Sequence, residues 1–127
     1  MKLLIDTHVL LWGMAADPKL SDDEAAALRA RRNKIFVSVV SFWEIAIKVR
    51  DRRLQAPDDL LARVQADPDF EILPVQAEHA WRVGTLPRFH RDPFDRLLIA
   101  QALCENLTLM THDRHMARYD APIFGRP

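Results

Sequence analysis

The chain has 127 residues, of which 49% are hydrophobic and 28% charged, and its 18 basic and 18 acidic side chains sum to a formal charge of zero. This length suits one domain over residues 1–127, and this composition excludes disordered and fibrous classes of protein. The neutral balance by itself argues against a nucleic-acid-binding protein. Basic side chains nevertheless cluster at residues 29–34, 48–53 and 88–96, and a solvated surface explains the first two clusters about equally well.

The apolar stretch near the N-terminus does not have the layout of a signal peptide or a membrane span. Asp6 and His8 interrupt it, and its longest unbroken apolar run, residues 9–16, is too short to cross a bilayer. The single cysteine, Cys104, cannot form an internal disulfide, which is typical of a reducing compartment. We therefore expect a cytoplasmic protein that does not contact a membrane.

Strands alternate with helices along the chain. Ser21 and Glu24 have the spacing of a capping box, and Asp92 precedes a proline at the first position of a helix. Right-handed crossovers between such strands produce a mostly parallel sheet that helices cover on both faces, so we predict a three-layer α/β/α domain. In chain order the predicted elements are a strand at 2–5, helices at 7–16 and 21–32, a strand at 35–39, helices at 42–53 and 57–66, a strand at 71–75, a helix at 77–83, a helix that begins after Asp92, and strands at 107–110 and 121–124.

Four acidic residues stand close to the ends of apolar runs or the start of a helix: Asp6, Glu44, Asp95 and Asp113. If the runs are parallel strands, these carboxylates gather at the carboxyl edge of one sheet, where open α/β folds place their ligands. Carboxylates that crowd together repel one another, and such clusters usually hold hard divalent cations. The pattern predicts a metal-dependent enzyme.

Each acid also has a purely structural explanation. Asp6 and Asp113 could cap the turns that follow them, and Asp95 could simply stabilise its helix by interacting with the positive end of the helix dipole. Glu44 could complete a capping box with Ser41. The shared position of the four acids in the predicted sheet favours a common site.

The other polar and aromatic residues indicate no second catalytic site. His112 and His115 lack the further ligands that a zinc site needs, and three glycines in the whole chain provide no phosphate-binding loop. Four aromatic residues lie on helical stripes and are interpreted as core: Trp12, Phe42, Trp43 and Trp81.

Four segments resemble the signature blocks of PIN-domain proteins, and more narrowly those of the VapC toxins of type II toxin–antitoxin pairs. They are residues 3–8, 41–48, 90–102 and 111–113, and the block HRDPFDRLLIAQA at 90–102 is the most specific. The resemblance covers essentially the full chain. It implies a PIN-like fold with strand order 3-2-1-4-5, an Mg²⁺- or Mn²⁺-dependent endoribonuclease, a homodimer and a small VapB-like antitoxin as partner.

The resemblance also assigns residues. The acids of the family correspond to Asp6, Glu44, Asp95 and Asp113, as catalytic residues and metal ligands, and Thr111 corresponds to a hydroxyl that lines the site. We further expect RNA phosphates to contact Arg88, His90, Arg91 and Arg96. The antitoxin, or a second copy of the chain, is expected on the apolar first and third helices, around Val9, Trp12, Phe42 and Trp43.

Two rival interpretations belong to other classes. A signalling receiver domain needs paired acids after its first strand and a lysine after its last, whereas Asp6 stands alone and no lysine lies near Thr111. We reject that class. A PIN fold that serves only as a binding scaffold stays open as the alternative function, although the full acidic set argues against it. The sequence does not identify the RNA substrate.

Overall fold

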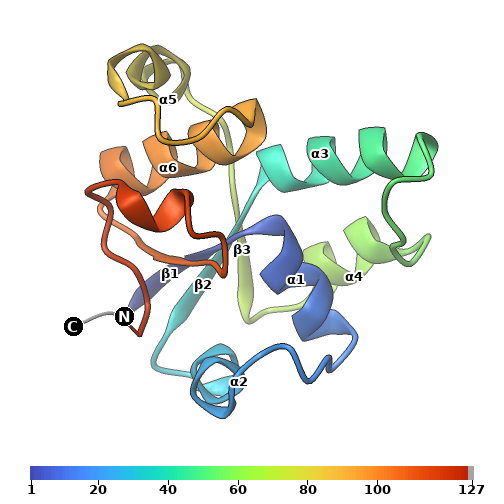
Figure 1. The fold of residues 1–127 in the computed structure, drawn as a ribbon. Coiled ribbons are helices and arrows are strands. Elements are labelled where there is room, and N and C mark those ends of the chain that lie inside the picture. Colours follow the sequence, from blue (N-terminus) through green and yellow to red (C-terminus); the bar gives the residue numbers. More distant parts are fainter. Residues whose placement is uncertain (126–127) are drawn as a thin grey trace.

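A four-stranded parallel sheet forms the centre of the computed structural model, which describes residues 1–125 (Figure 1). The strands lie in the order β3-β2-β1-β4 and are β1 (Lys2–Ile5), β2 (Lys34–Ser38), β3 (Phe70–Leu73) and β4 (Thr108–Met110). Ile5 is in register with both Val37 and Met110. The carboxyl ends of three neighbouring strands are therefore level at one edge of the sheet.

Helices cover both faces of this sheet. Figure 1 shows α5 (Ala77–Arg82) and α6 (Pro93–Glu105) on one side of the strands, and α1 (Thr7–Met14), α2 (Asp22–Arg29) and α4 (Leu60–Ala66) on the other. The remaining helices are α3 (Val39–Arg50) and the short 3-10 turns Val83–Thr85 and Met116–Arg118. The predicted three-layer α/β/α architecture is confirmed. Within residues 1–125, no helix combines the length and the apolar character that a bilayer crossing requires.

Alternation along the strands builds two hydrophobic cores. Leu3 and Ile5 pack in the core that contains helix α1, whereas Leu4 packs in the core that contains Leu98 and Ile99 of α6. All five side chains are at most 1% exposed. Burial of both faces is expected of a parallel sheet, and each such side chain stabilises the fold by about 1.5–3 kcal/mol.

The strand predicted at 121–124 is reduced to a single bridge. Ile123 pairs in parallel with Leu109, and the amides of Leu109 and Phe124 donate to Pro122 and Leu109 at 2.8 and 2.9 Å. Pro122 has no N–H to extend the ladder. The fifth position of the expected order 3-2-1-4-5 is thus one bridge beside β4.

The third helix begins earlier than predicted. Ser38 is its N-cap and accepts from the Val40 amide at 3.0 Å, so the β-branched pair at 39–40 belongs to the helix rather than to the strand. The cap overrides the strand preference of these residues. The capping box at Ser21 and the N-cap at Asp92 are both confirmed. Other predicted bounds shift by a few residues: α1 ends at Met14, α2 at Arg29, α3 at Arg50, and α4 begins at Leu60.

Candidate active site

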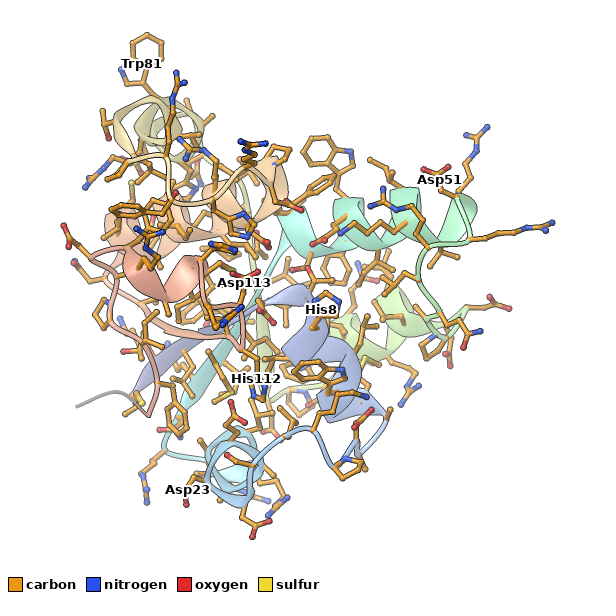
Figure 2. All side chains as sticks on the ribbon, in the orientation of Figure 1. His8, Asp23, Asp51, Trp81, His112 and Asp113 are labelled. Carbon is orange, nitrogen blue, oxygen red and sulfur yellow. The ribbon has the colours of Figure 1, made fainter. Side chains whose placement is uncertain are left out.

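One pocket at the carboxyl edge of the sheet contains all four predicted acids. Its volume is about 400 Å³, and its lining residues are Asp6, His8, Trp12, Glu44, Lys48, His90, Asp92, Asp95, His112 and Asp113. Three of these, His8, His112 and Asp113, lie near one another in Figure 2. Because the lining comes from segments far apart in the chain, the fold rather than local sequence assembles the pocket.

Asp6 serves as a helix cap and as a pocket residue at once. Its Oδ1 accepts from the Val9 amide at 2.8 Å, which caps α1, and its Oδ2 accepts from the hydroxyl of Thr111 at 2.6 Å. Burial is the largest influence on this carboxyl and raises the pKa of Asp6. Asp6 therefore caps α1, as its position in the sequence allows, and it also lines the pocket.

Glu44 has no capping role. It lies in the second turn of α3, and its side chain is 3% exposed. Its Oε1 accepts from the hydroxyl of Thr7 at 2.6 Å, and its Oε2 pairs with the ammonium of Lys48 one turn later. The capping box that Ser41 and Glu44 could have formed is absent because the helix begins at Val39.

Asp95 does not cap α6, because Asp92 is the N-cap of that helix. The carboxylate of Asp92 accepts from the amides of Phe94 and Asp95 at 2.8 and 3.1 Å. Burial, followed by the negative charges of Asp92, Glu44 and Asp6, raises the pKa of Asp95 to about 7. Such a carboxyl holds its proton until a cation or higher pH removes it.

His90 bridges two of the acids. Its Nε2 lies 2.9 Å from Asp95 Oδ2 and 3.2 Å from Asp113 Oδ2. The Asp92 amide donates to Nδ1 at 3.1 Å, so the proton of the neutral ring is on Nε2 and is donated to the carboxylates. No local pattern in the sequence indicates this position for His90.

Asp113 combines a turn cap with a place in the pocket. Its Oδ1 accepts from the amides of His115 and Met116 at 2.7 and 3.0 Å. Partial burial opposes its ionisation, but these hydrogen bonds and the nearby His90 outweigh burial and lower the pKa of Asp113. The pKa of Asp95 is thus raised and that of Asp113 is lowered within one pocket.

The structure brings some of the acids closer together than others. Asp95, Asp113 and His90 each place a ligand atom within 4.8 Å of the others. Within residues 1–125 that group does not include Asp6 or Glu44, which line the same pocket. Burial, and after it the negative charges of neighbouring carboxylates, raises the pKa of Asp95, and oxygen donors crowded in this way fit a hard divalent cation such as Mg²⁺ or Mn²⁺.

The basic residues of the 88–96 cluster separate into two kinds. Arg88 and Arg91 are exposed. Arg96 instead donates to the carbonyls of Val83, Leu86, Pro87 and His90 and to the Tyr119 hydroxyl, at 2.9–3.4 Å. These contacts fasten the 83–90 loop, and an additional contact of Arg96 with RNA stays a prediction.

Lys48, which lines the pocket, and Thr7, which donates to Glu44, were not among the predicted site residues although the sequence contains a signal for each. Lys48 follows Glu44 by four residues, the spacing of an ion pair on one helical face, but it was placed only in the basic cluster at 48–53, which a solvated surface explains about equally well. Thr7 directly follows Asp6 and was read only as a helix start.

The interpretation of the aromatic residues as core is wrong for Trp43 and Trp81, which are 54% and 86% exposed. Trp81 projects from α5 into solvent (Figure 2). Trp12 lines the acid pocket, next to His112 at a ring-centroid distance of 4.9 Å. Conversely, Val9 is 0% exposed and cannot belong to a docking surface. Helical stripes alone do not tell which side chains the neighbouring helices cover.

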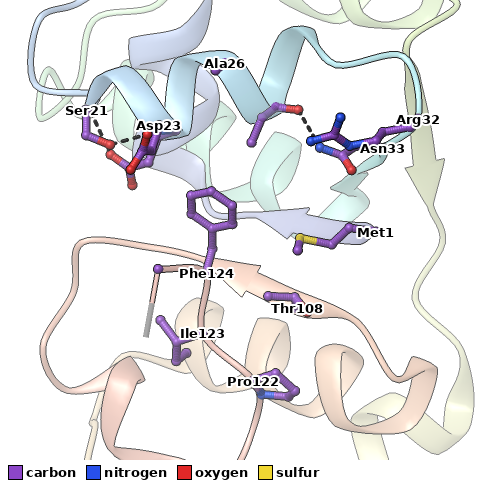
Figure 3. Close-up of a pocket in the computed structure, with 13 residues that line it drawn as sticks. Met1, Ser21, Asp23, Ala26, Arg32, Asn33, Thr108, Pro122, Ile123 and Phe124 are labelled. Carbon is purple, nitrogen blue, oxygen red and sulfur yellow. Dashed lines mark hydrogen bonds between the residues drawn. The ribbon is translucent and has the colours of Figure 1, made fainter. Parts of the chain in front are cut away.

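A larger hollow of about 880 Å³ lies between α2 and the segment around Phe124 (Figure 3). The ring of Phe124 points into it, and Ser21 and Arg32 lie toward opposite ends. Glu24 lines this hollow and also contacts His112 at 2.8 Å. None of the four acids lines the hollow, so it belongs to a different part of the surface.

The chain is similar to known proteins along nearly its whole length. A family model described as PIN domain matches residues 3–122. Ribonuclease VapC22 of Mycobacterium tuberculosis is 28% identical over 131 residues, which covers 94% of this chain and 93% of the relative.

Solved structures share the fold. The VapBC2 structure from Rickettsia felis, bound to a DNA fragment from their promoter, matches with a TM-score of 0.71 and 20% identity over 97% of this chain and 96% of that chain. The FitAcB structure from Neisseria gonorrhoeae matches with a TM-score of 0.66 and 19% identity over 97% and 96%. The resemblance seen in the sequence is confirmed, and the protein belongs to the PIN-domain family.

Proposed function

We propose that this PIN-domain protein is a metal-dependent endoribonuclease and the toxin of a toxin–antitoxin pair. The observation that carries the proposal is the pocket in which Asp6, Glu44, Asp95 and Asp113 converge at the carboxyl edge of the sheet. The likeness to a VapC ribonuclease over 94% of the chain supports the same activity.

Mg²⁺ or Mn²⁺ is the proposed cofactor. Asp95 and Asp113 would hold it together with Asp6, and Glu44 would hold a second ion or order water. When bound, the metal supplies positive charge to the phosphodiester and acidifies the attacking water. Hydrolysis consumes one water and breaks the bond from phosphorus to O3′, which leaves a 5′-phosphate and a 3′-hydroxyl.

The other residues of the chain hold these carboxylates in place. Thr111 fixes the orientation of Asp6 through its 2.6 Å hydrogen bond, and Thr7 does the same for Glu44. Asp95, whose pKa is raised to about 7, gives up its proton near neutral pH. Fixed ligands of this kind need little reorganisation during the reaction.

The RNA backbone is proposed to cross the exposed side chains of Arg88 and Arg91, in the loop that leads to Asp95. His90, which lies between Asp95 and Asp113, would border this path. Cationic side chains beside a nuclease site attract phosphates of any sequence.

The antitoxin is proposed to dock on α3. Val39, Trp43 and Ile47 recur every four residues there and are 41%, 54% and 37% exposed, so they form one apolar stripe. A groove beside α4, lined in part by Phe42 and Leu61, continues this apolar surface. The similar VapBC structures, which are toxin–antitoxin complexes, support such a partner. A second copy of the chain is the competing occupant, because a homodimer is also expected.

The activity is tested by incubating purified protein with total RNA in Mn²⁺, in Mg²⁺ and in EDTA, and sequencing the 5′-phosphate ends. We expect cleavage at defined sites with either metal and no cleavage in EDTA. Asp95→Asn is the matched control and should abolish cleavage. RNA that stays intact under every condition would instead favour the binding-scaffold alternative.

A further inference from the structure

Lys48 differs from the other paired lysines of the chain. Its side chain is 17% exposed and pairs with Glu44, which is 3% exposed. The pairs of Lys19 with Asp17 and of Lys34 with Glu71 involve lysines that are 63% and 64% exposed. Surface pairs of that kind contribute little, whereas a buried charge requires a partner and a reason to be there.

Neighbouring side chains fix the ammonium in the acid pocket. Glu44, itself held by the Thr7 hydroxyl at 2.6 Å, accepts one of its hydrogen bonds. The ring of Phe94 lies beneath it, with Nζ 5.9 Å from the ring centroid, and Trp43 meets Phe94 edge to face at 4.8 Å. Lys48 is therefore held in position before any ligand binds.

The ammonium of Lys48 has N–H donors that Glu44 does not use. It carries three N–H groups, and within residues 1–125 its one hydrogen bond is to Glu44. The side chain also lines the pocket that contains Asp6 and Asp95. A positive charge with free donors in a metal-binding pocket opposes the metal but attracts an anion, such as a phosphate oxygen.

We propose that Lys48 is a catalytic residue that binds a non-bridging oxygen of the scissile phosphodiester, with Glu44 as its anchor. The inference rests on the proposed nuclease function. Negative charge grows on the phosphate oxygens in the transition state, so a fixed ammonium beside them stabilises that state more than the bound RNA. In this role Glu44 positions the ammonium of Lys48, in addition to any contact that Glu44 makes with metal.

This role makes three predictions for Lys48→Met, and the effects on metal binding and on catalysis have opposite signs. Removing a positive charge beside the carboxylates should tighten Mn²⁺ binding, on the order of tenfold. Removing a phosphate contact should lower kcat on the order of a hundredfold. It should also reduce the slope of RNA affinity against salt by about 0.7, the value for one phosphate contact to a single strand. A side chain that only braces Glu44 would weaken metal binding and leave the salt slope unchanged.

The experiment uses the full chain and a mixed-sequence single-stranded RNA 20-mer. Mn²⁺ affinity is measured by calorimetry, cleavage by gel, and RNA affinity by fluorescence anisotropy in an Asp95→Asn background that keeps the RNA intact. Lys34→Met is the control, because it removes the same charge at the start of β2. Lys48→Arg should retain most of the salt slope.

A second measurement leaves Lys48 unchanged, in case Lys48→Met leaves Glu44 buried without a partner and does not fold. Reductive methylation of the Asp95→Asn protein, with and without the RNA, is read by mass spectrometry. RNA should protect Lys48 and leave Lys34 reactive.

The outcomes distinguish a failure of the proposed nuclease function from a failure of the proposed role of Lys48. If the wild type neither binds Mn²⁺ nor cleaves RNA, the proposed function itself fails. If the wild type does both, but RNA leaves Lys48 unprotected and Lys48→Met matches Lys34→Met in cleavage and salt slope, only the role of Lys48 is overturned.

Discussion

The raised pKa of Asp95 makes the metal-free protein less stable as pH rises. Folded Asp95 holds its proton up to a pKa of about 7, whereas the unfolded chain releases it near 3.8. Between these values the folded state binds the extra proton, so its stabilising contribution is full at low pH and is lost as pH rises through 7. Each pH unit in that window changes the free energy of unfolding by up to about 1.4 kcal/mol, or about 2–3 kcal/mol between pH 5 and pH 8.

Asp95→Asn removes this titration and keeps the shape of the side chain. The free energy of unfolding is measured by urea denaturation in EDTA at pH 5, 6.5 and 8 and constant ionic strength. Relative to wild type, the variant should become more stable by about 2–3 kcal/mol between the lowest and highest pH. Asp69→Asn, which changes an exposed carboxylate, is the control. Parallel pH profiles for wild type and Asp95→Asn would contradict the burial of Asp95 among like charges.

Three further changes probe the surroundings of the site. Asp6→Asn keeps the oxygen that caps α1 but removes a negative charge from the pocket. In differential scanning fluorimetry, Mn²⁺ should therefore raise the melting temperature of wild type clearly and that of the variant much less. Arg91→Gln should weaken binding of a single-stranded RNA and reduce its salt slope by about 0.7; an unchanged slope would remove Arg91 from the RNA path. Trp43→Ala should reduce affinity for the cognate antitoxin by at least tenfold in calorimetry, whereas Trp81→Ala, on a different helix, should not.

The fold was predictable because its signals are local and repeated. The apolar runs of β1, β2 and β4 and the caps at Ser21 and Asp92 each specify one element, and alternation of strands with helices then specifies a parallel sheet. The start of α3 was not predictable in the same way. Val39 and Val40 favour a strand by propensity, and the cap at Ser38 decides the boundary only in the folded chain.

The convergence of the four acids on one pocket was predictable from the sequence, but the place of His90 between two of them was not. Asp6, Glu44, Asp95 and Asp113 stand at equivalent places in the sequence pattern, and strands in register bring those places together. His90 reaches Asp113 across 23 residues of chain through a loop that Arg96 fastens. Such contacts depend on tertiary packing, which spacing along the sequence does not encode.

Binding of a divalent metal by these acids can be observed by anomalous diffraction from crystals grown with Mn²⁺. Data collected at the manganese absorption edge locate the ion without reference to activity. We expect an anomalous peak in the pocket, within about 2.0–2.6 Å of carboxylate oxygens of Asp95 and of Asp6 or Asp113. A pocket without a peak at saturating Mn²⁺, or a peak bound only elsewhere on the protein, would contradict it.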